Sequence, residues 1–584
     1  MRSRPGRALF FVAAIAGTLL LAAAAPMRAA GSGWQQLTHP PPFNPGVMFL
    51  LTDGRVMVQD QGSAENGSSN WWLLTPDAHG GYADGTWRQA ASMPSDYAPL
   101  YAASAVLPDG RLAVEGGEFN LGQFVETNKG AIYDPVANTW TPISPPAGGA
   151  GNWSNIGDAP SVVLADGRWL VGASGFSGTT DAAIFNASNL TWTTTGAGKA
   201  DGNGEEGFTL LPSGKVLTVD AKPQSCTTRN TELYDPASGT WAGAGLTPAP
   251  LVQCGGDNDG EIGPQMLMHD GKVFAEGATS ATALYDTASG TWAAGPSLPV
   301  VGGQQLVAAD ASSALLPDGK VLLELSPDVG VPPTHFFLFD GTSLTQIADD
   351  ANAANEASNY DYMLVLPTGQ VMLDSRLGPS SLELYSDGGS PNAAWEPQIA
   401  SVPNLLTAGD TYTVSGKQLN GLSDGAAFGD DWQMSTDYPL VQITSNTTGT
   451  VTYARTFGMT NRSIAPGAAS ASNFTMPACI PQGPSQLRVI ADGIASAPVS
   501  VTVGETAPCG QIPKCVVPKV IGKRLAAAKT AIRKARCSVG RISRAYSTRV
   551  KSGRVISQKP RPRAKLAVGS AVKLTVSRGK RHRH

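Results

Sequence analysis

The most regular feature of the chain is an apolar stretch, a tight polar turn containing glycine, and a second apolar stretch. Seven copies occur, at residues 49–58, 105–114, 162–171, 209–218, 266–275, 314–323 and 364–373. The turn reads Asp-Gly in five of the seven copies. Because such turns require positive φ, each copy is predicted to form a β-hairpin.

A second pattern, an apolar stretch and a turn ending in tryptophan, follows four of these hairpins. It occupies residues 132–140, 184–192, 233–241 and 284–292 and predicts an outer hairpin. Two hairpins make one four-stranded sheet, and the turn glycines recur every 47 to 57 residues, the period of a propeller blade. The sequence therefore predicts a mainly β protein with a seven-bladed propeller over residues 31–395. Trp34 or Trp395 can supply the outer strand of the closing blade.

After the repeats, the pattern changes to short strands of alternating polarity. They fall at 411–416, 439–444, 450–456, 485–491 and 498–503 and predict an immunoglobulin-like β-sandwich over residues 396–503. A linker at 504–514 leads to a small α+β domain at 515–579 and a basic tail at 580–584.

The N-terminus has the pattern of a secretory signal peptide, predicted over residues 1–30. Arg2, Arg4 and Arg7 precede an apolar run that ends near Ala25, and small residues follow. A retained transmembrane anchor is the alternative. The signal peptide predicts a secreted protein with no transmembrane segment after cleavage.

Export makes the six cysteines candidates for disulfide bonds. Pairing between sequence neighbours is preferred among the fifteen possible connectivities, and a zinc site would need tighter Cys and His clusters. The preferred pairs are Cys226 with Cys254, Cys479 with Cys509, and Cys515 with Cys537.

Charge is distributed unevenly along the chain. From Thr506 onward there are 22 Lys and Arg residues and no acid, so the first 505 residues hold 42 − 22 = 20 basic residues against all 46 acids. A basic end of this kind is typical of contact with a polyanion. In an exported protein, a wall polymer or surface polysaccharide is favoured over nucleic acid, and a basic domain that is merely soluble is the alternative.

The hairpin repeat resembles that of kelch-type propellers, in particular the galactose oxidase group of secreted copper radical oxidases, over residues 34–504. In that family, copper ligands stand nine or ten residues before certain turn glycines. Tyr101 matches one such tyrosine, but Asn359 and Tyr360 stand where the family has Tyr-His, and residues 456–461 lack the second histidine. Because a copper site of this type needs at least two imidazoles, we expect neither copper nor radical oxidation.

The positions eight to ten residues before each turn glycine, here called strand-start positions, are rich in acids. We predict that they line one mouth of a central channel, where crowded carboxylates favour a cation such as Ca²⁺, an amino sugar or the basic tail. Alternatives are hydrogen bonding of each acid to backbone amides and a catalytic carboxylate pair for glycoside cleavage. The predicted mouth residues are Tyr101, Asp158, Glu205, Glu206, Glu261, Asp310, Tyr360 and Asp361.

The C-terminal domain resembles a PASTA domain, a small module of exported bacterial kinases and penicillin-binding proteins. The resemblance rests on residues 517–522 (VPKVIG), an Ala-rich helix at 526–535, residues 555–560 (VISQKP), and Gly569 before residues 572–576 (VKLTV). It implies a bacterial protein that binds peptidoglycan or muropeptides, although some members act only as spacers.

Three functional classes fit these features. The favoured one is a secreted, cell-wall-associated, non-catalytic protein whose propeller binds a glycan or protein and whose PASTA-like domain binds peptidoglycan. The others are an enzyme that acts on polysaccharide through the mouth carboxylates, and a structural or adhesive surface protein. The fold resemblance cannot separate them, because propellers host many functions.

Overall fold

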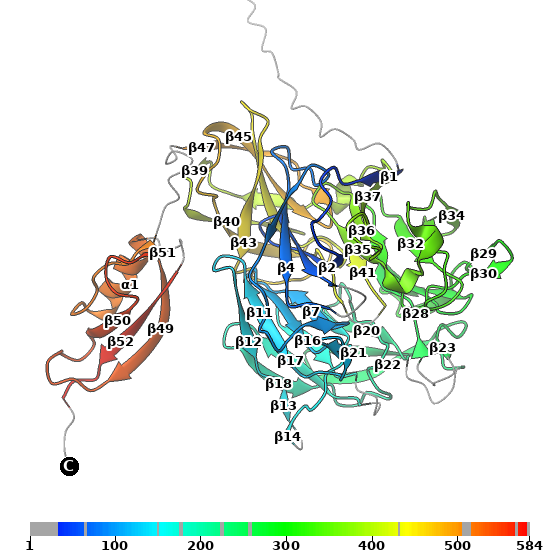
Figure 1. Cartoon of the computed structure of the whole chain (residues 1–584), viewed down its shortest axis with the longest axis horizontal. Coiled ribbons are helices and arrows are strands. Elements are labelled where there is room, and N and C mark those ends of the chain that lie inside the picture. Colours follow the sequence, from blue (N-terminus) through cyan, green and yellow to red (C-terminus); the bar gives the residue numbers. More distant parts are fainter. Residues whose placement is uncertain are drawn as a thin grey trace, which may run out of the picture.

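The computed structural model describes residues 33–62, 67–148, 151–174, 179–221, 227–254, 260–429, 432–504, 515–535, 537–566 and 570–580. The described part is mainly β, with one α-helix (Figure 1). The predicted signal peptide, most of the predicted linker and the last four residues lie outside it. None of its helices is long and apolar enough to span a membrane.

Residues 33–395, the N-terminal part, form seven antiparallel sheets that each begin with a predicted Asp-Gly type hairpin. The first three are β2 (Pro45–Leu50), β3 (Val56–Asp60), β4 (Trp71–Thr75) and β5 (Thr86–Gln89); β7 (Ala103–Val106), β8 (Leu112–Glu115), β11 (Gly130–Asp134) and β12 (Thr139–Ile143); and β15 (Ser161–Val163), β16 (Trp169–Gly172), β17 (Ala182–Asn186) and β18 (Thr191–Thr195).

The next four sheets follow the same order of strands. They are β19 (Thr209–Leu210), β20 (Val216–Val219), β21 (Asn230–Asp235) and β22 (Thr240–Leu246); β25 (Gln265–Leu267), β26 (Lys272–Glu276), β27 (Thr282–Asp286) and β28 (Thr291–Ala294); β31 (Ser313–Leu315), β32 (Val321–Leu325), β33 (His335–Phe339) and β34 (Leu344–Gln346); and β35 (Tyr362–Val365), β36 (Val371–Asp374), β37 (Leu382–Ser386) and β1 (Gly33–Gln36).

The first strands of successive sheets contact one another. The contacts run from β7 through β15, β19, β25, β31 and β35 to β2. Of the two tryptophans considered for the outer strand of the last sheet, Trp34 provides it, because β1 pairs with β37. Trp395 instead ends the short 3-10 helix η3 (Ala393–Trp395).

Short hairpins and 3-10 turns lie in the connections between these strands and sheets. They are β6 (Pro99–Leu100) with β9 (Phe119–Asn120) and β10 (Gln123–Phe124), β13 (Ala147–Gly148) with β14 (Gly151–Asn152), β23 (Gln253–Cys254) with β24 (Gly260–Glu261), β29 (Val300–Val301) with β30 (Gln304–Gln305), η1 (Ala353–Asn355) and η2 (Ser358–Tyr360).

Residues 396–504, the middle part, form a nine-stranded sheet in which all five predicted strands are present. The order is β38-β40-β44-β43-β42-β45-β47-β39, with β46 beside β45, so the strands follow one continuous path instead of two separate sheets. The cause is β43, which pairs with β42 over residues 451–454 and with β44 over residues 455–457. The strands are β38 (Gln398–Ser401), β39 (Leu405–Leu406), β40 (Thr411–Lys417), β42 (Leu440–Ser445), β43 (Val451–Phe457), β44 (Ala469–Thr475), β45 (Gly483–Ala491), β46 (Ile494–Ala495) and β47 (Val499–Val503).

The middle part docks on the turns of the N-terminal part. Glycine is required at position 110 for two reasons. Its φ is +80°, and a Cβ there would lie 2.8 Å from the carbonyl oxygen of Thr456. Beside it, the Thr52 hydroxyl donates to the same Thr456 oxygen at 2.8 Å. The hairpin glycine thus serves both the turn and the interface.

One segment of the middle part reaches in among the first strands of the N-terminal part. Its strand β41 (Ala426–Ala427) pairs with β31 as a fifth strand of that sheet (Figure 1). Phe428 packs against Tyr362 at 5.2 Å between ring centroids, and Trp432 packs against Phe49 at 5.9 Å. Residues on both sides of the boundary predicted at residue 396 therefore pack against one another.

The C-terminal domain, residues 515–580, has its own small core. Helix α1 (Leu525–Lys534) buries Ala528 and Ile532 in a cluster with Val555 and Val572. The strands are β48 (Cys515–Val516), which pairs with β51 (Lys565–Leu566), and β49 (Ser538–Ala545) and β50 (Val555–Lys559), which flank β52 (Ala571–Ser577).

The predicted disulfide between Cys515 and Cys537 is confirmed and ties β48 to the start of β49. The other two predicted pairs involve Cys226 and Cys509, which lie outside the described residues.

Candidate functional site

Three of the strand-start residues share an unusual backbone conformation. Tyr101, Glu205 and Asp310 have φ of 49°, 60° and 55°, in the left-handed region. Each stands nine residues before its turn glycine, so the conformation recurs at one register position in three sheets. A left-handed non-glycine residue costs about 1–3 kcal/mol, and such residues cluster at functional sites.

Arg376, which follows β36, brings together the predicted residues Tyr101 and Tyr360 and a third tyrosine, Tyr362, that was not predicted. Its guanidinium lies 5.7 Å from the ring centroid of Tyr101, 5.3 Å from Tyr360 and 5.4 Å from Tyr362. Its Nη1 donates to the Tyr101 hydroxyl at 3.1 Å, and its Nε donates to Gln61 Oε1 at 3.0 Å. Arg376 is itself left-handed, with φ of 56°. Three aromatic faces around one arginine form a rigid cationic centre.

A pocket of about 210 Å³ lies beside this centre. Arg376, Tyr360, Gln61, Asn44 and Glu356 are among the residues that line it. Burial, and then the charges of nearby acids, raise the pKa of Glu356 to about 11, so at neutral pH it is an uncharged carboxylic acid. Guanidinium, amides, a phenol ring and a neutral acid suit a small polyhydroxylated or anionic group.

The structure places the predicted acids in several environments. Asp158, Glu205, Glu261 and Asp310 are half-buried. Asp310 lies against the inserted segment, since a Cβ on Gly429 would lie 2.7 Å from its Oδ1. Glu206 is fully buried and pairs with Lys199 at 2.9 Å, in a different cluster from the tyrosines.

The segment 359–362, which contains the predicted mouth residues Tyr360 and Asp361, is largely buried. Asp361 is 0% exposed. Burial and the neighbouring acid Glu324 raise the pKa of Asp361 well above its usual range. A carboxyl that keeps its proton can enter the core at a much lower cost than a charged one.

The residues around Arg376 do not fit the copper site of the oxidase group. The position among the tyrosines is taken by a guanidinium, which donates hydrogen bonds and binds no metal. Among the described residues, His269 is buried against Trp395 at 4.6 Å and His335 pairs with Asp349 at 2.8 Å, so neither belongs to this cluster.

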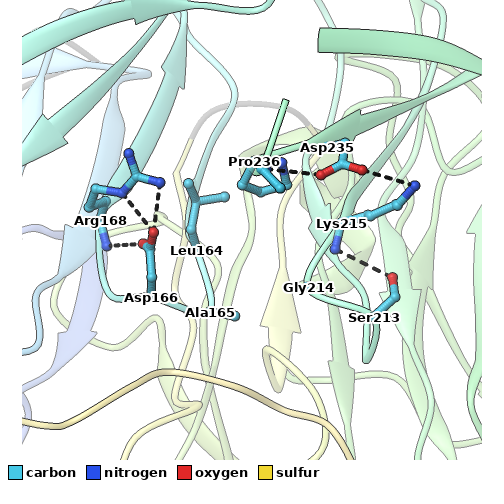
Figure 2. Close-up of a pocket in the computed structure, with 10 residues that line it drawn as sticks. Leu164, Ala165, Asp166, Arg168, Ser213, Gly214, Lys215, Asp235 and Pro236 are labelled. Atoms are coloured by element: carbon cyan, nitrogen blue, oxygen red, sulfur yellow. Dashed lines mark hydrogen bonds and ion pairs between the residues drawn. The ribbon is translucent and has the colours of Figure 1, made fainter. Parts of the chain in front are cut away.

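A larger pocket, of about 420 Å³, lies between the turns of the third and fourth sheets (Figure 2). Its charges are satisfied locally: Arg168 pairs with Asp166 at 2.6 Å and Lys215 with Asp235 at 3.2 Å. These are the ordinary ion pairs of exposed hairpin turns, so we assign no ligand to this pocket.

The C-terminal domain presents a second surface of functional interest. It contains no acidic residue, and all of its described Lys and Arg side chains are exposed or half-exposed. On its sheet, Lys559 lies directly opposite Lys573 on the neighbouring strand. This is a concentrated positive surface with no internal counter-charge.

Comparison with known proteins bears on the C-terminal domain and much less on the rest. Residues 516–578 match the family model of the PASTA domain. A solved structure of a fungal alcohol oxidase of the AA5 family, in complex with copper, is similar over 81% of this chain and 100% of that chain, with 17% sequence identity and a TM-score of 0.43. That likeness is too weak to carry an argument, and no curated protein matches the chain. The PASTA domain predicted at the C-terminus is confirmed.

Proposed function

We propose that the chain is a secreted, cell-wall-associated bacterial protein that binds without catalysis, and that its PASTA domain binds peptidoglycan or an anionic wall polymer. One observation supports this most: Lys559 faces Lys573 in a domain that has no acid. Like charges at facing strand positions destabilise a sheet, and an anionic polymer lying over the strands would relieve the repulsion.

In this proposal the N-terminal part is a seven-bladed kelch-type propeller. Support comes from seven sheets with one strand order and from the succession of contacts between their first strands. The pocket beside Arg376 is the proposed position for a glycan or for a polar group of a partner protein. Its volume of about 210 Å³ leaves room for one small group only.

Sedimentation of the mature full-length chain with purified sacculi, at low and high salt, tests the proposal. Lys559→Gln combined with Lys573→Gln removes the facing pair. Arg533→Gln combined with Lys534→Gln removes the same charge from the last turn of α1 and is the matched control. We expect about tenfold weaker binding for the sheet variant, or about 1.4 kcal/mol, and a smaller loss for the helix variant.

The outcomes separate the possible causes. Equal losses in the two variants would mean that only net charge attracts the wall. Binding that disappears from sacculi stripped of anionic polymers assigns the ligand to those polymers, whereas retained binding assigns it to peptidoglycan. A chain that does not sediment at all contradicts wall attachment, and release of soluble sugar would favour the enzyme hypothesis.

A further inference from the structure

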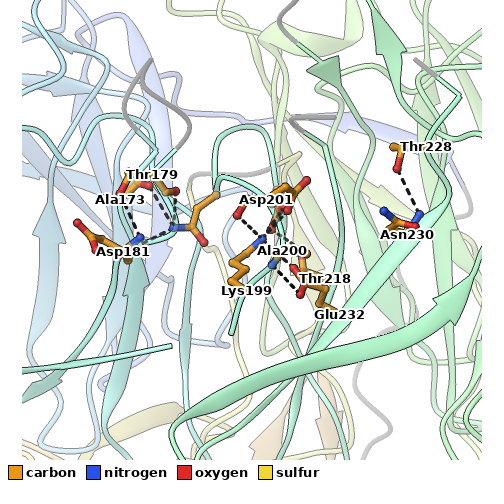
Figure 3. A network of polar contacts seen from close by, with 12 residues as sticks. Ala173, Thr179, Asp181, Lys199, Ala200, Asp201, Thr218, Thr228, Asn230 and Glu232 are labelled. Atoms are coloured by element: carbon orange, nitrogen blue, oxygen red, sulfur yellow. Dashed lines mark hydrogen bonds and ion pairs between the residues drawn. The ribbon is translucent and has the colours of Figure 1, made fainter. Parts of the chain in front are cut away.

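The ammonium of Lys199, in the connection between β18 and β19, lies among more carboxylates than it can neutralise (Figure 3). Its Nζ is 2.9 Å from an oxygen of Asp201, 2.9 Å from one of Glu206 and 3.3 Å from one of Glu232. A fourth acid, Asp220, directly follows β20 and is 1% exposed. With all groups ionised, one positive charge faces four negative ones.

The hydrogen bonds in this cluster are unevenly distributed. Glu206 Oε2 accepts from the Thr218 hydroxyl at 3.0 Å, and Glu232 Oε1 accepts from the backbone N–H of Ala200 at 3.0 Å. Within the described part of the chain, neither oxygen of Asp220 accepts a hydrogen bond of normal geometry, although the Asn230 side chain interacts weakly with this carboxylate. Oδ2 of Asp201 likewise accepts none. Buried carboxylate oxygens are normally paired, hydrogen-bonded or bound to a metal, so these three oxygens need a further partner.

We propose that Asp201, Asp220 and Glu232 bind a divalent cation, with Ca²⁺ the best fit. One oxygen from each of the three side chains lies within 4.8 Å of the others, the span of two Ca–O bonds of about 2.4 Å. All three are hard oxygen ligands, the type that Ca²⁺ prefers. The Asp201 side chain is 17% exposed, which gives the ion a path from solvent.

Lys199 holds the carboxylates in place but does not block the oxygens that would bind the ion. It pairs with Oδ1 of Asp201 and leaves Oδ2 for the ion. A divalent ion would bring the formal charge of the cluster from −3 to −1. The site is distinct from the channel mouth expected from the sequence, because Glu206 is the only predicted mouth residue in it and is already held by Lys199 and Thr218.

Terbium luminescence of the chelator-treated full-length chain tests the site. The ring of Trp241 lies 5.4 Å from Lys199 Nζ, so an indole stands close enough to sensitise bound Tb³⁺. We expect emission on indole excitation that Ca²⁺ displaces, with Ca²⁺ binding in the range of about 10⁻⁴ to 10⁻³ M that extracellular modules show. Asp220→Asn should weaken Ca²⁺ binding by more than about tenfold.

Asp181→Asn is the matched control, because Asp181 is an exposed acid outside the cluster (Figure 3). If Asp220→Asn does not fold, as judged by circular dichroism, the part-exposed Asp201→Asn replaces it. Emission that Ca²⁺ does not displace, or that is the same in wild type and in the cluster variant, overturns the proposal. Equal weakening in Asp181→Asn would show that general surface charge binds the ion and would overturn it as well.

Discussion

Two buried cations, Arg462 in the middle part and Lys199 in the N-terminal part, are held in opposite ways. Arg462 donates Nε to the backbone oxygen of Asp437 at 3.0 Å and Nη1 to that of Val106 at 2.8 Å, and it pairs with the Asp437 carboxylate through Nη2. Lys199 forms ion pairs with three carboxylates, and a fourth lies beside them. Arg462 forms a direct ion pair with one carboxylate and joins two parts of the chain, although the acids Asp424 and Asp492 interact with the same pair. Lys199 contacts three carboxylates directly.

The difference teaches how to separate a structural ion pair from a binding site. Burial raises the pKa of Asp437 to about 6, while Arg462 acts against that rise. Burial, and then the charge of Asp201, raise the pKa of Asp220 to about 7, with Lys199 acting against the rise. What separates the Lys199 cluster is that Asp201, Asp220 and Glu232 place one oxygen each within 4.8 Å of the others, and that convergence points to a ligand.

The largest effect on stability is expected from breaking the ion pair between Arg462 and Asp437. Arg462→Met leaves Asp437 buried without its partner and should lower the free energy of unfolding by about 3–5 kcal/mol. Denaturant unfolding followed by tryptophan fluorescence measures it. Arg488→Met is the control, because Arg488 is half-buried and donates to one backbone oxygen, that of Ser496. A loss below about 1 kcal/mol would contradict a structural role for Arg462.

The next largest effect is a gain in stability, expected when Asp220 is replaced. In the folded chain Asp220 holds its proton up to about pH 7, against 3.8 for its usual value. Its contribution to stability is therefore complete below about pH 4 and is lost as the pH rises through 7. In chelator at pH 8, Asp220→Asn should raise the free energy of unfolding by about 2–4 kcal/mol, and the gain should vanish near pH 4.

The same substitution in the other cluster provides the contrast. Burial raises the pKa of Asp437 only to about 6, and Asp437→Asn also removes the carboxylate that pairs with Arg462, so at pH 8 this variant should be less stable than Asp220→Asn. Unfolding of both variants in one pH series is the measurement. If both aspartates behave alike, the proposed difference between the clusters is wrong.

Replacing Lys199 should lower the free energy of unfolding by less than replacing Arg462. In chelator near pH 7, Lys199→Met should cost about 2 kcal/mol, because the part-exposed Asp201 stays hydrated and the acids can take up protons. Ca²⁺ should stabilise wild type and Arg462→Met by the same amount, because both keep the site, and should stabilise Lys199→Met by more, because the ion replaces the lost positive charge. A Ca²⁺ effect that is no larger in Lys199→Met than in Arg462→Met would contradict the assignment.

Local features of the fold could be predicted from the sequence, and the clusters could not. The hairpins, the outer hairpins that end in tryptophan and the Cys515–Cys537 bond depend on residues near one another in the chain. Arg376, in contrast, meets Tyr101 across 275 positions, and β41 pairs with β31, which lies more than a hundred residues earlier in the chain. Neither contact leaves a periodic signal, so the tyrosines were found without the arginine between them.

The Lys199 cluster was hidden for a related reason. Glu206 was identified by its distance from a turn glycine, but Lys199, Asp220 and Glu232 stand at positions that no repeat marks. The burial of Asp361 could not be predicted, because sequence alone assigns a carboxyl its charged form, whereas burial in the folded chain raises the pKa of this one and favours its neutral form. A charged group's position thus depends on neighbours that only the folded chain supplies.

The smallest effect concerns the exposed counterpart of the Lys199 cluster, the facing pair Lys559 and Lys573. Lys573→Glu replaces a like-charge pair by an opposite one and should stabilise the C-terminal domain by about 0.2–1 kcal/mol while weakening its binding to sacculi. Calorimetric unfolding of the full-length chain measures the first change, and sedimentation measures the second. Lys573→Gln, which removes the repulsion without adding attraction, should fall between wild type and Lys573→Glu in both. If stability does not rise while binding falls along this series, the facing lysines do not serve to bind a ligand. An excess of like charge would then indicate a binding site in the buried Lys199 cluster but not on the surface of the C-terminal domain.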